Sequence, residues 1–80
     1  MSEDISTKEI EEGLTEALKM IQKNLKLSFK LIQTNPEKEK QIISLWKNYI
    51  DKLVKQVTIM SEKYNNNKII KALTKSFLFG

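Results

Sequence analysis

Apolar residues recur at heptad spacing along the first third of the chain, which places them on one face of a helix. We call this set of positions the first seam. The apolar residues of the first seam are Leu14, Leu18, Ile21, Leu25 and Ile32, and the polar Ser28 is its one interruption. Ser6 or Thr7 suits the helix N-cap, and glutamates follow near the positive end of the helix dipole. We therefore predict a helix over about residues 8–33, after a flexible polar lead at residues 1–7.

A second and more regular heptad follows, which we call the second seam. Its members are Ile43, Trp46, Ile50, Leu53, Val57, Met60 and Tyr64. This pattern predicts a helix over about residues 37–64. Residues 65–67 are asparagines, which are poor helix formers, and the sequence leaves open whether they end the helix, kink it or stay within it. A last helix is expected over about residues 68–79, separate from the second or continuous with it.

The clearest break in the sequence is Asn35-Pro36. The residue before a proline is disfavoured in the α region, and Pro36 suits the first position of a new helix with Asn35 as its cap. Because the loop spans only residues 34–36, we expect antiparallel helices whose seams face each other. The sequence thus predicts an all-α fold in a single domain of residues 1–80: a coiled-coil-like, antiparallel two-helix hairpin with a C-terminal helical extension.

Two helices bury one stripe each, and this chain has more apolar residues than two stripes can hold. The surplus residues are Leu27, Phe29, Leu31, Ile42, Leu45, Tyr49, Ile59, Phe77, Leu78 and Phe79. At about 25 cal/mol per Å² of apolar surface, leaving them exposed forgoes a free energy comparable to the stability of a small domain. We expect association between chains to cover them. The alternative is a compact three-helix bundle in which the last segment folds back on the hairpin.

The composition excludes most kinds of catalytic and metal site. The sequence has no cysteine, histidine or arginine, and its only glycines are Gly13 and Gly80, so no glycine-rich phosphate loop is present. The acidic residues after position 16 are scattered among lysines. We predict that the protein is not an enzyme and has no catalytic residue, cofactor or metal.

Charge is distributed unevenly along the 80 residues, whose net charge is +4. Residues 1–16 hold six acids and one lysine, whereas residues 17–80 hold thirteen lysines and four acids. Two lysine stripes at helical spacing are Lys19, Lys23, Lys26 and Lys30, and Lys68, Lys71 and Lys75. Such stripes fit a nucleic acid or an anionic membrane surface, but no arginine is available to read base edges. We expect no nucleic acid partner, and keep a small lysine-rich nucleic-acid-binding protein as an alternative.

The start of the chain is acidic and lacks the basic region and apolar run of a classical signal peptide. Charged or polar residues also interrupt every apolar stretch well before eighteen residues. We therefore predict neither a classical signal peptide nor a membrane span.

Short motifs follow one another in a characteristic order over residues 18–80. They are an apolar-Gln-x-x-apolar pattern, a Lys-Leu pair, an Asn-Pro loop, paired aliphatics before an aromatic residue, an asparagine-rich stretch before Lys-apolar-apolar-Lys, and a terminal phenylalanine. The residues that carry them are 21–25, Lys30-Leu31, Asn35-Pro36, Ile42-Ile43, Trp46, 65–71 and Phe79. In type and order, these motifs resemble the needle subunits of bacterial type III secretion systems.

The resemblance implies a structural virulence protein that polymerises into a hollow helical filament. That filament lies outside the cell and conducts unfolded effector proteins. The subunit is exported by the type III apparatus itself, so its location is secreted and at the cell surface. The implied partners are further copies of the chain, cytoplasmic chaperones before export, the base and tip proteins of the apparatus, and the transiting effectors.

The resemblance also implies roles for individual residues. Asn35 and Pro36 shape the outer loop of the hairpin. Asn66, Lys68 and Lys71 face the channel. The implied contacts between subunits are Ile69, Ile70, Leu73, Phe77, Leu78 and Phe79. The sequence also leaves open a cytoplasmic helical-bundle adaptor or immunity-like binding module, which a stable small oligomer would favour.

Overall fold

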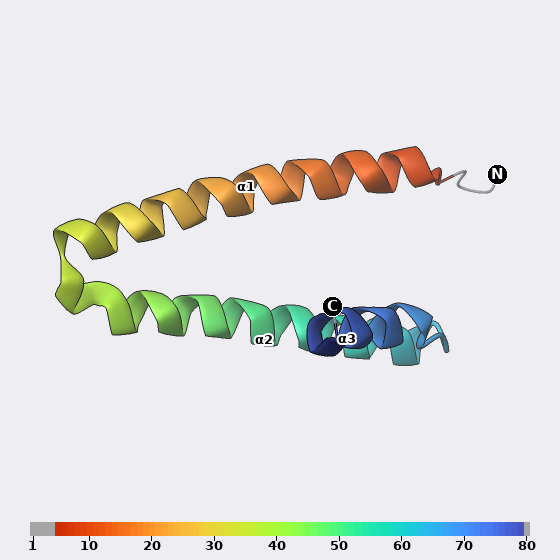
Figure 1. Cartoon of the computed structure of the whole chain (residues 1–80). Coiled ribbons are helices and arrows are strands. Elements are labelled where there is room, and N and C mark those ends of the chain that lie inside the picture. The colour runs from red at the N-terminus through yellow and green to blue at the C-terminus, as the bar shows by residue number, and fades with distance from the viewer. Residues whose placement is uncertain (1–4, 80) are drawn as a thin grey trace. The chain divides into compact units, whose positions relative to one another are not determined.

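The computed structural model describes the backbone of residues 5–79 and the side chains of residues 5–76. This part of the chain is helical and contains no strand, which confirms the predicted all-α class (Figure 1). The elements are α1 (Thr7–Thr34), a short 3-10 helix η1 (Pro36–Lys38), α2 (Glu39–Lys63) and α3 (Lys68–Phe79). The chain divides into two compact units, Met1–Ile42 and Ile43–Gly80, and each is described by itself. The antiparallel hairpin and the single domain concern both units together and stay predictions.

Helix α1 begins with a side-chain cap. The backbone N–H of Glu9 donates a hydrogen bond of 3.2 Å to the hydroxyl oxygen of Ser6, which stands in extended conformation just before the helix. This bond satisfies one of the backbone N–H groups that have no partner within the helix. Of the two caps that the sequence offered, Ser6 is therefore the one used, and Glu9 lies in the first turn.

The break between α1 and α2 is a single residue followed by a 3-10 turn. The N–H of Asn35 donates to the carbonyl of Leu31 at 2.7 Å, and the N–H of Lys38 donates to the carbonyl of Asn35 at 2.9 Å. Pro36 opens η1, and η1 contacts α1. Asn35 holds the cap position, but its side chain makes no capping bond. The expectation that Asn35 caps an α-helix is wrong in this respect, because the turn after Pro36 is 3-10 and uses the carbonyl of Asn35 instead.

Helix α2 ends in a Schellman motif at the asparagines. Asn65 has a φ of 52°, in the left-handed region that asparagine tolerates better than most residues. The N–H of Asn66 donates to the carbonyl of Ser61 at 2.9 Å, and the N–H of Asn65 donates to that of Glu62 at 3.2 Å. These two bonds satisfy carbonyls at the helix end. The asparagines therefore end the helix, and α2 and α3 are separate.

Helix α3 begins with a local turn made by Asn66. The N–H of Lys68 donates to the side-chain oxygen Oδ1 of Asn66 at 2.9 Å, and the N–H of Lys71 donates to the carbonyl of Asn67 at 3.0 Å. Asn66 thus closes α2 with its backbone and opens α3 with its side chain.

Little of the described chain is buried. Ile42 is 7% exposed and is the one hydrophobic residue there that is fully buried. Eight further residues are half-buried: Ile21, Ser28, Ile32, Asn35, Trp46, Val57, Ser61 and Ile70. Over the described residues, no helix has both the length and the apolar character that a membrane crossing requires.

Candidate self-association surface

The first seam lies on α1 and is largely uncovered. Leu14 is 66% exposed and Leu18 is 53% exposed, and Leu25 is also exposed. Ile21 and Ile32 are half-buried. Any exposure measured on the whole chain is a lower bound for the unit Met1–Ile42 taken alone. The first seam is therefore an apolar strip that its own unit does not cover.

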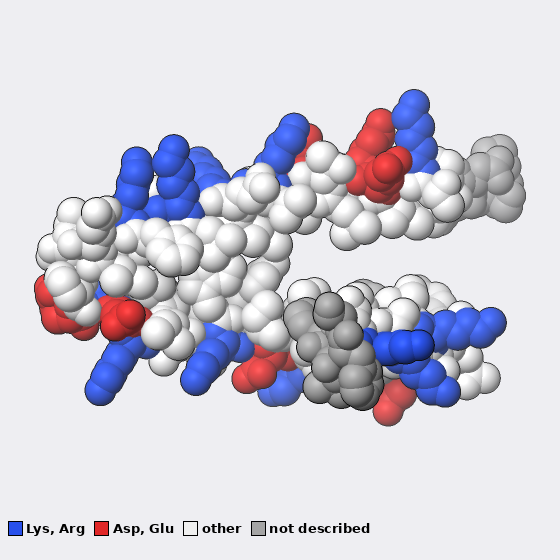
Figure 2. All heavy atoms as spheres, in the orientation of Figure 1, with Lys and Arg blue, Asp and Glu red and all other residues white. Residues whose placement is uncertain are grey.

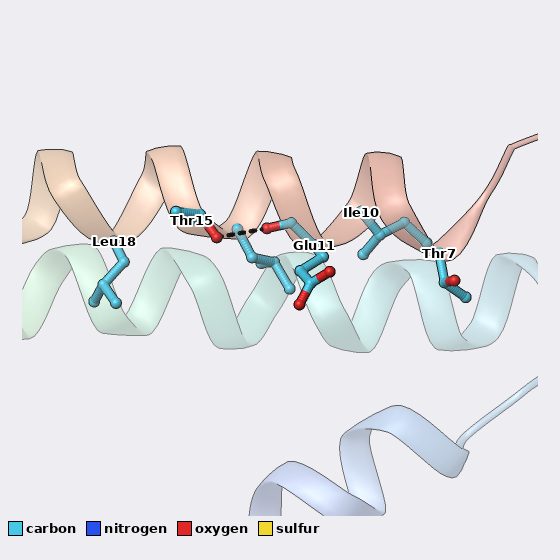
Figure 3. Close-up of a pocket in the computed structure, with 6 residues that line it drawn as sticks. Thr7, Ile10, Glu11, Thr15 and Leu18 are labelled. Carbon is cyan, nitrogen blue, oxygen red and sulfur yellow. Dashed lines mark hydrogen bonds between the residues drawn. The ribbon is translucent and has the colours of Figure 1, made fainter.

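The N-terminal part of the first seam borders a shallow hollow on α1 (Figure 3). Its lining residues are Thr7, Ile10, Glu11, Leu14, Thr15 and Leu18. Ile10 is exposed and extends the apolar strip by one helical turn beyond Leu14. It lies four residues before Leu14 and so on the same face of α1, although the strict heptad places Glu11 at the preceding position.

Polar side chains within and beside the first seam are bonded to their own helix. Ser28, the polar interruption, donates to the carbonyl of Asn24 at 2.7 Å, and Asn24 donates to the carbonyl of Met20 at 3.0 Å. In the hollow, the Thr15 hydroxyl donates to the carbonyl of Glu11 at 2.9 Å. Because each of these donors has a partner in α1, an apolar neighbour can cover the seam without leaving them unsatisfied.

The second seam is also exposed along most of α2. Its exposed members are Ile43, Ile50, Leu53, Met60 and Tyr64, whereas Trp46 and Val57 are half-buried. The rings of Trp46 and Tyr49 meet edge to face, with centroids 6.3 Å apart and an angle of 82° between their planes. Trp46 thus makes a ring contact with Tyr49, which lies outside the second seam.

Ile42 corrects the assignment of the second seam. The sequence pattern placed Ile42 in the surplus expected to contact other chains and placed Ile43 in the seam, but Ile42 is buried and Ile43 is 44% exposed. Steps of four, three and four residues lead from Ile42 to Trp46, Tyr49 and Leu53. Ile42 therefore fits a heptad as well as Ile43 does. Ile42 directly follows the first turn of α2 and belongs to the same compact unit as α1 and η1.

The C-terminal residues implied to line a channel or to join subunits are mostly exposed. Lys68, Lys71, Ile69 and Leu73 are exposed, and Ile70 is half-buried. The Asn66 side chain is engaged at the start of α3. The side chains of the three remaining predicted contact residues lie outside the described residues: Phe77, Leu78 and Phe79.

Charged side chains gather on one side of α1, with acidic groups nearer its N-terminal end (Figure 2). Within the described chain, one ion pair is formed, between Lys19 and Glu16 at 3.7 Å, and both side chains are well exposed. An exposed pair of this kind contributes little to stability. The described residues contain no group of three side chains that could hold a metal ion.

Comparisons of the chain with protein-family models, with curated proteins and with solved structures give no match in any of the three.

Proposed function

We propose that the chain is a self-assembling structural subunit of a bacterial type III secretion needle. The observation that carries the proposal is the exposure of large apolar side chains on every helix while Ile42 alone is fully buried among the described residues. Phe29 is 70% exposed and Ile69 is 68% exposed, so the exposed set reaches from α1 into α3. A protein of this size rarely leaves so much apolar surface to water unless other chains cover it.

Association is the physical remedy for this exposure. Burying one large apolar side chain contributes about 1.5–3 kcal/mol, so covering only a few of them offsets the entropy lost when chains associate. The two seams have the heptad spacing by which helices pack side by side. When one surface of each subunit contacts a different surface of the next, the contact repeats from copy to copy and the assembly grows by addition of subunits.

In the proposed assembly, each subunit is an antiparallel hairpin of α1 and α2. Helices of 28 and 25 residues are roughly 40 Å long, at about 1.5 Å per residue. The short connection through Asn35 and η1 brings the two seams together within the subunit. The surplus apolar residues on the other faces, such as Leu27, Phe29 and Leu45, then contact neighbouring subunits.

The C-terminal helix supplies the channel wall in this proposal. Lys68 and Lys71 face the channel, where mobile ammonium groups stay hydrated beside unfolded effectors, and Asn66 holds the start of α3. Ile69, Ile70 and Leu73, with Phe77, Leu78 and Phe79, join subunits to one another. The subunit is kept unassembled by cytoplasmic chaperones, leaves the cell through the type III apparatus and meets its base and tip proteins at the two ends of the filament.

A variant of the surplus apolar residues and a matched control test the proposal. Leu27→Asn with Phe29→Asn removes apolar area from the proposed contact between subunits, and Gln22→Asn with Gln33→Asn makes the same number of changes at other exposed positions of α1. Light scattering at rising concentration, with electron microscopy of the same samples, should show filaments for the wild type and the control and none for the Leu27→Asn, Phe29→Asn variant. A monodisperse small oligomer in all three samples would overturn the needle and favour a binding module. Equal filaments in all three would remove these two residues from assembly.

A further inference from the structure

The polar face of α1 carries opposite charges in two consecutive segments. The acidic segment is Glu9, Glu12 and Glu16, with Lys8 at its start, and the basic segment is Lys19, Lys23, Lys26 and Lys30. With 3.6 residues per turn, all eight positions fall within an arc of about 100° on the side of α1 opposite the first seam. All eight side chains are exposed. Charged groups project from one side of α1 (Figure 2).

These charges have little to pair with inside α1. Glu16 and Lys19 meet where the two segments join, and theirs is the one ion pair formed within the described chain. Glu12 and Lys23 are eleven residues apart, which is about 16 Å along the helix axis, and Glu9 and Lys30 are about 30 Å apart. Lys8 lies one turn before Glu12 but forms no ion pair with it. Lys23, Lys26 and Lys30 have no carboxylate within one helical turn, so the basic segment beyond Lys19 is without a partner on its own helix.

We infer that this face of α1 docks against the same face of α1 in a second copy of the chain, with the acidic segment of one copy against the basic segment of the next. In a parallel neighbour shifted by about 14 residues, or about 21 Å, Glu9, Glu12 and Glu16 lie level with Lys23, Lys26 and Lys30. Two neighbours on the same copy then stand about 42 Å apart, which is the length of the 28-residue α1, so they do not overlap.

In a row of shifted copies, the copy at one end has an unpaired acidic segment and the copy at the other end has an unpaired basic segment. Each copy that joins the row leaves the same two segments free at its ends. A head-to-tail contact of this kind stays open and grows. The inference rests on the proposed function, because an antiparallel pair would use the same charges to make a closed dimer.

Other occupants fit the face less well. An anionic membrane surface or a nucleic acid is attracted by the four lysines but meets three carboxylates on the same side of the same helix. A second copy of α1 matches both segments at once. Charge complementarity therefore favours self-association.

The charges set register and rate more than affinity. Exposed ion pairs are individually weak and are screened by salt, with a Debye length of about 10 Å at 0.1 M and about 3 Å at 1 M. The surplus apolar residues supply most of the free energy of association, and the two charged segments determine which offset between neighbours is preferred.

Two charge-reversed variants and their combination in one chain test the inference. Lys23→Glu with Lys26→Glu places carboxylates in the basic segment, and Glu9→Lys with Glu12→Lys places ammonium groups in the acidic segment. Each pair of changes alone should raise the concentration at which assembly begins by about tenfold or more, and the chain that carries all four changes should assemble near the wild-type concentration, because opposite charges again face each other at every contact. Lys52→Glu with Lys55→Glu, on α2, makes the same charge change away from the face and should assemble like the wild type. Circular dichroism of each variant confirms that the helices persist, since lysines in the first turn also oppose the helix dipole.

The outcomes separate this inference from the proposed function. Wild-type filaments together with unimpaired filaments from both reversed variants would overturn the charge contact and leave the needle standing. A wild type that forms only a closed dimer, with recovery of dimers in the combined variant, would overturn the shifted contact and the needle together. Loss of assembly in each variant without recovery in the combined variant would also overturn the inference, because it would show that the substitutions act within the separate chains.

Discussion

Asn66 accepts a hydrogen bond at its side-chain oxygen from the backbone N–H of Lys68, at a distance of 2.9 Å. The backbone N–H of the same asparagine closes α2 by donating to the carbonyl of Ser61. One residue therefore ends one helix and begins the next. The resemblance placed Asn66 in the channel wall, and the structure gives its side chain a local task at the junction of α2 and α3.

Asn66→Ala should loosen the first turn of α3. Removing the side-chain acceptor at a helix start costs about 1 kcal/mol, so the amide protons of that turn should exchange faster by roughly fivefold. Hydrogen exchange followed by NMR, at conditions that keep the chain unassembled, measures this directly. Asn66→Asp is the matched control, since it keeps an oxygen at the same place. Equal exchange in the two variants would show that the bond does not hold the turn.

Asn65 should be replaceable by glycine but not by valine. Its φ of 52° lies in the left-handed region, which glycine adopts freely and which a β-branched residue adopts only with strain. We expect Asn65→Gly to keep the break between α2 and α3, and Asn65→Val to drive residues 65–67 toward helix at a cost of about 1–2 kcal/mol to the left-handed turn. The Cα chemical shifts of those residues separate the two cases. Helical shifts in the glycine variant, or an unchanged break in the valine variant, would contradict this reading.

Gly13→Ala should stabilise α1. A β-carbon built at Gly13 meets no atom within 4 Å beyond its chain neighbours and the backbone of its own helix, so alanine fits without displacing another side chain. An alanine in a helix interior is worth about 1 kcal/mol relative to glycine, and the thermal melt at 222 nm should shift upward. Ala17→Gly, one helical turn later, is the reverse change and should shift the melt downward by a similar amount. A lower melting temperature for Gly13→Ala would mean that the position is crowded.

Deleting residues 76–80 should abolish polymerisation while leaving the remaining helices intact. The deletion removes Phe77, Leu78 and Phe79, whose loss takes apolar area from the proposed contacts between subunits. Light scattering reports assembly, and circular dichroism reports helix content. A full-length chain with serine at those three positions controls for the change in length and should fail to assemble as well. Unimpaired polymers from the deletion would remove the tail from the mechanism.

The helices themselves follow from sequence, because heptad spacing and cap residues act locally. Ser6 and the glutamates after it mark the start of α1, and Pro36 marks the break before α2. The 3-10 form of the turn after Pro36 was not predictable, because proline at a first helical position suits both kinds of helix.

Burial is harder to read from the chain than helicity. Ile42 and Ile43 both fit a heptad through Trp46, and only the three-dimensional surroundings decide that Ile42 is the buried one. The three asparagines illustrate the same limit. They have identical side chains, yet Asn65 takes the left-handed conformation and Asn66 makes the side-chain bond. Their different conformations follow from their positions in the turn, and the residue type alone does not determine those positions.

Negative-stain electron microscopy of the purified wild-type chain at rising concentration shows whether the protein assembles as a needle subunit. Light scattering on the same samples shows whether the particles seen on the grid also exist in solution. A needle subunit should give uniform thin tubes with a central channel, of one diameter and of lengths that grow with concentration. A stable small oligomer at every concentration, with no filaments, would contradict the needle.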